Sequence, residues 1–439
     1  MNTYSKYKDS GKEWIGKIPE HWERRKLSSI AKRITDYVAS GSFASLNENV
    51  QYLDEPDYAM LVRTVDLSGT SADALKVYVD KHSYDFLNNS NLFGGELILS
   101  NIGSVGSVFI YEPMYQRATL APNAILIDME ECNRYYYYCF LSPLINDELK
   151  RVAASSVQPK ISKTQLRNFY VIHPPLNEQE LIAEYLDEEI GKINDVIEQQ
   201  QKQMEMFETY QRELIANCIT KGLDRDVPMK DSGVDWMDEV PKHWNVTKMK
   251  WMFEIVKRIY GAEDRDVLSI TQRGIKVKDI DSNDGQLAES YANYQVVNVN
   301  DFAMNSMDLL TGWVDCSPYE GVTSPDYRVF RFHPDKPQCH TYYKYLFQMC
   351  YTNRIFYRLG QRVSNLGRWR LQADQFLNMK MPQPPIEEQE QIAAYLDTKV
   401  GQIEELTADI KAQIEKLKEY RKIVIHDAVT GKIKVTEGE

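Results

Sequence analysis

Two short basic segments carry the residues of this sequence that are best suited to contacting a polyanion. Residues 155–163 read Ser-Ser-Val-Gln-Pro-Lys-Ile-Ser-Lys, and residues 360–371 read Gly-Gln-Arg-Val-Ser-Asn-Leu-Gly-Arg-Trp-Arg-Leu. Basic side chains interleaved with Gln, Ser and an aromatic suit hydrogen bonds to phosphate oxygens and to base edges. For either segment alone, a solvated basic loop is an equally good interpretation. The candidate contact residues are Lys160, Arg368 and Arg370, followed by Gln158, Arg362, Trp369, Arg63 and Arg273.

The two basic segments stand at equivalent places in an internal duplication. Each precedes a Pro-Pro pair, at 174–175 and at 384–385, and a shift of 210 residues places Lys160 on Arg370. Between 174–193 and 384–403, twelve of twenty positions are identical, which chance does not produce. Because both basic segments recur at equivalent places, a binding role is favoured over two unrelated solvated loops.

Each Pro-Pro pair opens a long predicted helix with an apolar seam. Two prolines give a rigid extended approach, and acidic residues in the first turn suit the helix dipole. Apolar residues then recur seven apart, as in the helices of a coiled coil. Matching seams need partners, so the two helices should pair with each other. The seam residues are Leu186, Ile193, Phe207 and Leu214 in the first helix, with Gln200 interrupting the pattern, and Leu396, Ile403, Ile410 and Leu417 in the second.

A second motif is duplicated nearer the start of each half. Between residues 9–26 and 231–248, eight of eighteen positions match, including the pair His21 and His243. The offset is 222 here and 210 at the helices, so the second half is a net twelve residues shorter between the two motifs. We expect Trp14, Pro19 and Trp22 to form a compact apolar cluster against the neighbouring domain or a helix end.

The dissimilar middles, about 26–173 and 248–383, mix strand-like runs at 58–62, 96–100 and 327–332 with helical stretches near 135–152 and 342–358. They predict an α+β protein: two mixed α/β globules joined by two long paired helices in a pseudo-two-fold internal repeat. The predicted segments are 1–173, the helical 174–222, the linker 223–230, then 231–383, the helical 384–432 and the tail 433–439.

The net charge of −12 argues, taken alone, against nucleic acid. Residues 177–222 carry 11 acidic and 4 basic side chains, however, and residues 387–432 carry 10 and 7, so the helices account for −10 of it. The globules are therefore near neutral and can present local basic faces. The acidic run from Glu178 to Glu188 favours a solvated helix face, with a docking surface as the alternative.

The sequence offers no recognisable catalytic or membrane-spanning pattern. Gly11 to Lys17 fits a phosphate-binding loop by letter only, because Ile18-Pro19 follows instead of a Ser or Thr and a helix. The six cysteines show no paired spacing, and no apolar run approaches the roughly 20 residues of a membrane helix. We therefore expect a non-catalytic protein with reduced intracellular thiols.

The duplicated motifs resemble those of a known family. Trp14-Ile15-Gly16-Lys17-Ile18-Pro19-Glu20-His21-Trp22 follows W-x-G-x-I-P-x-H-W, and Pro174 to Gln179 and Pro384 to Gln389 both follow P-P-x-x-E-Q. With two dissimilar domains between them, these patterns resemble the specificity subunit of Type I restriction–modification enzymes over nearly the whole chain. The second head departs from the pattern at Asp238, where Gly is usual, and at Val240, where Ile is usual.

The resemblance implies a cytoplasmic DNA-binding subunit without an active site. The two middles would be target recognition domains, each reading one half of an asymmetric bipartite site in double-stranded DNA. The two long conserved helices would pair antiparallel as a coiled coil and set the distance between these domains. Two methyltransferase subunits carrying S-adenosylmethionine would dock on the conserved helices and methylate adenine. Motor-nuclease subunits would join them and use ATP and Mg. The alternative is a coiled-coil scaffold presenting two globules that bind something other than nucleic acid.

Overall fold

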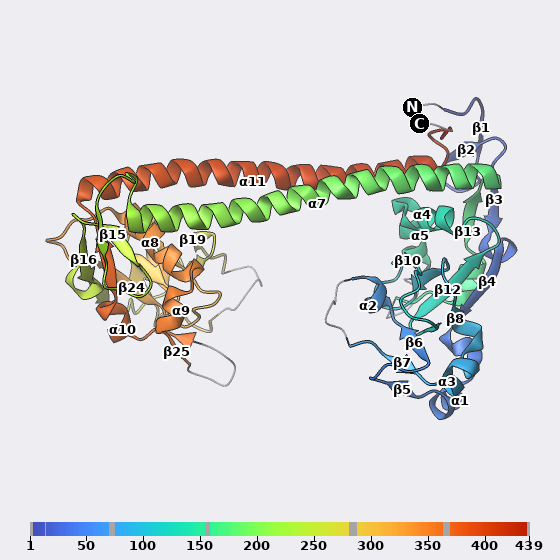
Figure 1. The fold of residues 1–439 in the computed structure, drawn as a ribbon, viewed down its shortest axis with the longest axis horizontal. Helices are drawn as coiled ribbons and strands as arrows, with labels where there is room; N and C mark the ends of the chain where they lie inside the picture. Colours follow the sequence, from blue (N-terminus) through green and yellow to red (C-terminus); the bar gives the residue numbers. More distant parts are fainter. Residues whose placement is uncertain are drawn as a thin grey trace. The chain divides into compact units, whose positions relative to one another are not determined.

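The computed structural model describes residues 3–13, 15–69, 75–153, 159–280, 288–362 and 369–436, with residues 361–362 described by their backbone only. The chain folds into two compact units (Figure 1). The first comprises Met1–Gln200 with Ala412–Glu439, and the second comprises Gln201–Lys411. Each unit therefore contains one variable middle, one head motif and a part of each long helix.

The first unit is built on a four-stranded antiparallel sheet. Its strands, in spatial order, are β10 (Val108–Ile110), β9 (Leu97–Ser100), β12 (Ala124–Met129) and β4 (Ala31–Asp36). Short continuous apolar runs are typical of strands buried on both faces. One face packs on a second sheet through Met60, Ile98 and Leu126. That second sheet has the order β5 (Tyr52–Leu53), β7 (Tyr78–Val79), β6 (Ala59–Val62), β11 (Ala118–Leu120), β8 (Asn91–Leu92). The helices of this middle are α1 (Phe43–Asn49), α2 (Thr64–Leu67), α3 (Lys81–Phe86), α4 (Asn133–Leu141), α5 (Pro143–Ala153) and α6 (Lys163–Arg167).

The second unit repeats the four-stranded sheet in the same order, although the two middles do not resemble each other in sequence. Its strands, from the edge equivalent to β10, are β22 (Val314–Cys316), β21 (Phe302–Met304), β24 (Arg328–Phe332) and β17 (Phe253–Val256). Its core is aromatic, because the rings of Phe302, Phe330 and Phe347 meet with centroids 5.2–5.4 Å apart. The accessory strands and helices are β18 (Leu268–Thr271), β19 (Gly274–Val277), β20 (Gln295–Val297), β23 (Gly321–Thr323), α8 (His340–Thr352), α9 (Ile355–Leu359) and α10 (Ala373–Asn378).

The head motifs form small sheets at the base of each middle. One two-stranded pair lies at the start of each head, namely β1 (Tyr7–Asp9) with β2 (Lys17–Pro19) in the first unit and β14 (Met229–Asp231) with β15 (Glu239–Pro241) in the second. The last strand of each head pairs with the strand that leads to the Pro-Pro pair. These pairs are β3 (Glu23–Lys26) with β13 (Tyr170–His173), and β16 (Asn245–Lys248) with β27 (Lys380–Gln383).

The two long helices are α7 (Leu176–Lys221) and α11 (Ile386–Val429). After α7 ends, Gly222 takes a φ of +75°, the left-handed conformation that commonly closes a helix. In the first unit Arg421 donates to Asn194 (2.7 Å) and Gln200 donates to Gln413 (2.8 Å), so the paired segments run antiparallel. In the second unit Ile219 of α7 and Ile392 and Leu396 of α11 belong to one apolar cluster, so both helices pack into the same core. The predicted fold class, with two mixed domains and two long antiparallel helices, is confirmed.

Candidate nucleic-acid interface

A single carboxylate fastens the first head motif to the start of α7. One Glu178 oxygen accepts hydrogen bonds from the Tyr4 hydroxyl (2.6 Å) and from Trp22 Nε1 (2.9 Å). His21 Nε2 lies 2.7 Å from the other oxygen. Because Trp22 is fully buried, its N–H cannot turn to water and depends on Glu178. We refer to this arrangement as the first joint.

The second unit contains the same joint. Trp244 Nε1 donates to Glu388 (2.8 Å), and His243 Nε2 lies 2.6 Å from the other oxygen of that carboxylate. The duplicated P-x-H-W and P-P-x-x-E-Q patterns are therefore the two sides of one contact, made twice. Of the expected apolar cluster, Pro19 and Trp22 are buried, and Trp14 lies outside the described residues.

The glutamine that follows each joint carboxylate is buried and ties the helix start to the chain around it. Gln179 Nε2 donates to the Pro174 carbonyl (2.9 Å) and to the Glu131 carboxylate. Gln389 Nε2 donates to the Pro384 carbonyl (2.8 Å), and its Oε1 accepts from the Cys339 amide (3.0 Å). Since Glu131 and Cys339 precede α4 and α8, these amides connect each long helix to its own domain.

The acidic run at the start of α7 is only partly the solvated face that its composition favours. Glu178 holds the first joint, and the Tyr138 hydroxyl donates to Asp187 (2.6 Å), which also pairs with Arg134. The second unit repeats this contact between Tyr345 and Asp397 (2.8 Å). The sequence did contain a signal for these roles, because Glu178 and Asp187 are among the positions that are identical in the two copies.

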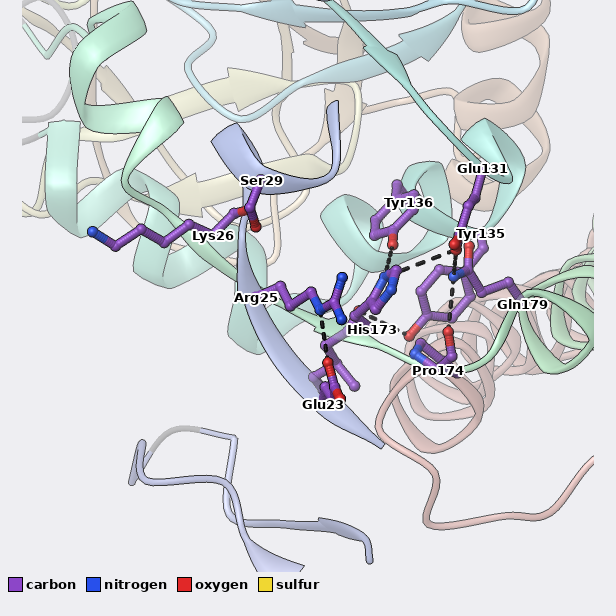
Figure 2. A network of polar contacts seen from close by, with 11 residues as sticks. Glu23, Arg25, Lys26, Ser29, Glu131, Tyr135, Tyr136, His173, Pro174 and Gln179 are labelled. Atoms are coloured by element: carbon purple, nitrogen blue, oxygen red, sulfur yellow. Dashed lines mark hydrogen bonds and ion pairs between the residues drawn. The ribbon is translucent and has the colours of Figure 1, made fainter. Parts of the chain in front are cut away.

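In the first unit a polar network surrounds the end of β13 (Figure 2). His173 Nδ1 lies 2.7 Å from the Tyr136 hydroxyl and 3.9 Å from a Glu131 carboxylate oxygen. Burial lowers the pKa of His173, against the opposing effect of Glu131, which favours the neutral imidazole. The second unit has Gln383 at this position, which cannot titrate.

The joints and networks position a short stretch in each unit that we name the crossing segment: residues 159–161 in the first and 369–371 in the second. Ile161 donates its amide to the Asn101 carbonyl (3.1 Å), just beyond β9. Leu371 donates its amide to the Ser306 carbonyl (3.1 Å), just beyond β21. Both apolar side chains are fully buried. The two crossing segments are thus anchored at equivalent places on equivalent sheets.

The anchors leave the preceding basic residues at the surface. Lys160 is exposed and forms a β-bridge with Ile102 at the edge of the 101–107 loop. Trp369 and Arg370 are half-buried in β26 (Trp369–Arg370), which pairs with β25 (Gln361–Arg362). The Trp369 ring packs on Tyr357, with centroids 4.7 Å apart. The structure thus brings Lys160 and Arg370 to matching positions, each within its own unit.

The remaining candidates are placed differently. Arg273 is exposed in the turn between β18 and β19. The Arg63 guanidinium binds both carboxylate oxygens of Asp66 (3.0 and 2.8 Å) and the Leu75 carbonyl (2.8 Å) through Nε and Nη2, so much of its donor capacity is used within its own unit. Gln158 and Arg368 lie outside the described residues, as does the side chain of Arg362. Contact of any of these residues with DNA stays a prediction.

The predicted seam residues can also be located. Five are buried: Leu186, Ile193, Leu396, Ile403 and Ile410. Three are half-buried: Phe207, Leu214 and Leu417. Gln200, which interrupts the pattern in α7, donates to Gln413 of α11, so a polar pair replaces an apolar one at that level.

Comparison with known proteins identifies the class to which this architecture belongs. The family model for the Type I restriction modification DNA specificity domain matches residues 19–206 and 241–416, which together exceed half of the chain. The chain therefore belongs to this family, and its two matched regions correspond to the two halves of the internal repeat. As a specificity subunit it supplies DNA sequence specificity and is itself non-catalytic.

Individual relatives agree with this family. The putative type I restriction enzyme MjaX specificity subunit of Methanocaldococcus jannaschii is 26% identical, over 96% of this chain and 96% of the relative. The MjaVIII specificity subunit of the same organism is 24% identical, over 77% of this chain and 79% of the relative.

Two solved structures support the fold alone. One, from work on complex assembly and conformational transition of the type I R-M system, has a TM-score of 0.69 and 12% identity, over 95% of this chain and 99% of that one. The HsdS subunit from Thermoanaerobacter tengcongensis has a TM-score of 0.51 and 13% identity, over 95% and 98%. No helix in the described part of the chain is long and apolar enough to cross a membrane.

Proposed function

We propose that this chain reads an asymmetric, bipartite site in double-stranded DNA, one half with each domain, and directs two methyltransferase subunits to it. The observation that supports this most directly is the pair of crossing segments. They are anchored by the same backbone contact to the same kind of sheet, yet they present different residues, Lys160 in one unit and Trp369 with Arg370 in the other. Two sheets of the same topology that present different side chains are suited to binding two half-sites of a DNA duplex that differ in base sequence.

The chemistry of modification and restriction would be supplied by the partners in the cytoplasm. Methyltransferase subunits would bring S-adenosylmethionine for adenine methylation, and motor-nuclease subunits would bring ATP and Mg. The contribution of this chain would be to bind DNA through the basic residues of its crossing segments and to hold the partners on its long helices. Lys160 and Arg370 would contact phosphate or base edges, with the remaining basic candidates around them.

The helices carry a duplicated apolar feature that supports docking of two like partners. Val196 and Leu406 are 210 positions apart, as are Tyr210 and Tyr420, so each pair is equivalent in the repeat. All four side chains are 42–52% exposed. The first unit thus displays Val196 with Tyr420, and the second displays Leu406 with Tyr210. Exposed apolar groups repeated in this way suit two copies of one partner.

A domain exchange tests the reading of DNA. Residues 26–173 are replaced by the middle of another specificity subunit, and adenine methylation is mapped in a host that also makes the methyltransferase. One half-site should change and the other should stay, and DNA binding should weaken steeply with salt through release of counterions. A change in both half-sites, or no DNA retention at low salt with the partner present, would contradict the proposal and favour a scaffold for other ligands.

Docking is tested separately on the exposed helix residues. The double variant Val196→Asp with Leu406→Asp should lose co-purification with the methyltransferase, because it places charge on both equivalent surfaces. The matched control is Asp195→Ala with Glu405→Ala, which alters the neighbouring equivalent acidic positions and should keep the partner. Helix content by circular dichroism should be unchanged in both. Partner binding retained by the Asp variant would show that docking lies elsewhere.

A further inference from the structure

A buried arginine stands directly beside the second crossing segment. Arg328 is the first residue of β24 and is only 8% exposed. Its guanidinium donates to the Leu371 carbonyl (2.7 Å) and lies 5.0 Å from the centre of the Phe376 ring. Leu371 is therefore held from two sides, by Arg328 at its carbonyl and by Ser306 at its amide.

The charge of Arg328 is poorly compensated in the protein alone. The buried Nη1 atom has no hydrogen-bond partner, and no carboxylate in the described residues pairs with this guanidinium. The pKa of Arg328 is lowered to about 10, chiefly by burial; the nearby Tyr351 opposes this shift, and the positive charge of Arg370 contributes to it. An incompletely paired buried cation is costly, so packing alone does not account for an arginine here.

The first unit shows what packing alone would select. Arg328 pairs across the sheet with Met304, and Ile125 pairs in the same way with Leu99. Met304 and Leu99 are equivalent, because the residue after each begins the hairpin: Asn305 donates to the Trp313 carbonyl and Ser100 to the Ser107 carbonyl. An isoleucine therefore fills the place that Arg328 occupies in the second unit. The arginine is specific to the unit whose crossing segment carries Arg370.

We infer that Arg328 is a positioning residue for DNA reading by the second unit. By holding the Leu371 carbonyl it fixes the direction in which Arg370 leaves the crossing segment. A DNA phosphate at Arg370 would then compensate the positive charges of both Arg370 and Arg328, so the two arginines act together. This inference rests on the proposed DNA contact by Arg370.

A double-mutant cycle tests whether the two arginines act together. The full chain, assembled with its methyltransferase, is titrated with a duplex that carries the sequence found methylated in the host. Arg370→Ala and Arg328→Met should each weaken binding about tenfold, as expected for loss of one phosphate or base contact. The double variant should be no more than about twofold weaker than Arg370→Ala, because interacting residues are non-additive. Arg328→Lys, which keeps the charge and a donor for the Leu371 carbonyl, should recover most of the affinity.

Controls separate positioning from a loss of folding. Ile125→Met changes the equivalent core position of the first unit and should leave the affinity unchanged. If Arg328→Met does not fold, as judged by thermal unfolding, the cycle is run with Arg328→Gln, which keeps a polar group. Multiplied losses in the double variant, or unchanged affinity in Arg328→Met and Arg328→Gln, would overturn the inference while leaving the Arg370 contact intact. Unchanged affinity in Arg370→Ala would overturn the proposed contact itself and the inference with it.

Discussion

Removing the joint carboxylates should destabilise each unit to an extent that follows from the number of donors left behind. Glu178→Ala deprives the Tyr4 hydroxyl, Trp22 Nε1 and His21 of their acceptor, whereas Glu388→Ala deprives only Trp244 Nε1 and His243. The indole N–H groups belong to fully buried side chains and cannot be rescued by water. The histidines are more exposed and should contribute less.

The magnitude can be worked from these contacts. A hydrogen bond to a charged acceptor contributes about 1.5–3 kcal/mol, and the Glu178 and Glu388 side chains are 20% and 35% exposed, which favours the lower end. We expect a loss of about 3–4 kcal/mol for Glu178→Ala and about 2–3 kcal/mol for Glu388→Ala. The larger loss in the first unit reflects Tyr4, which adds a third donor there.

Chemical unfolding of the full chain, followed by circular dichroism, measures these losses. Hydrogen exchange of the amides in 20–26 and 242–248 shows which joint has opened. The control is Glu180→Ala, an exposed acid in the same turn, for which the change should be within about 0.5 kcal/mol. The reasoning would be refuted by a loss below about 1 kcal/mol in Glu178→Ala, or by faster exchange in the wrong unit.

Three further predictions concern the first joint and the polar contacts next to the two joints. Burial alone would raise the pKa of Glu178, but the hydrogen bonds from Tyr4, Trp22 and His21 hold it below its ordinary value of 4.5. The stability that the ionised carboxylate confers is therefore present above pH 4.5 and should fall as the pH drops below it. Melting curves in increasingly acidic buffers measure this fall, which should be smaller in Glu178→Gln. Burial lowers the pKa of His173, so stability should fall as the pH drops below about 6.5, and His173→Gln, which copies Gln383, should flatten that part of the melting profile. Gln389→Leu should cost about 1–3 kcal/mol in unfolding experiments, because the Cys339 amide and Pro384 carbonyl lose their partner, whereas a neutral result would mean that water replaces the amide.

Much of the fold was predictable because it depends on patterns of neighbouring residues, such as apolar runs, heptad spacing and prolines. The apolar runs at 58–62, 96–100 and 327–332 indicated strands and appear as β6, β9 and β24 within one residue at either end. The Pro-Pro pairs and the seam predicted both long helices. The helical stretch expected near 135–152 is broken instead into α4 and α5, because Pro143 lacks the amide that would continue the first helix.

The joints and crossing segments were harder to predict because their partners are distant in the sequence. Glu178 and Trp22 are 156 positions apart, and nothing in an acidic run states which carboxylate turns inward. The identity of Glu178 and Glu388 in the two copies indicated a shared role, but it did not identify the groups that donate hydrogen bonds to them. Arg328 carried no signal at all, because an arginine at the start of a strand ordinarily predicts an exposed residue.

By itself the sequence determined that this protein is a repeat: two heads, two unlike middles and two helices with matching seams, which is enough to name its family. Only the tertiary structure decided which motifs contact each other and that two middles without shared sequence adopt the same sheet order. It also decided that Lys160 and Arg370 each stand directly before a residue whose amide is bound to the equivalent sheet. The physical reason is that periodicity and chain stiffness act between near neighbours. Burial and hydrogen bonding between distant residues depend on the whole packed core.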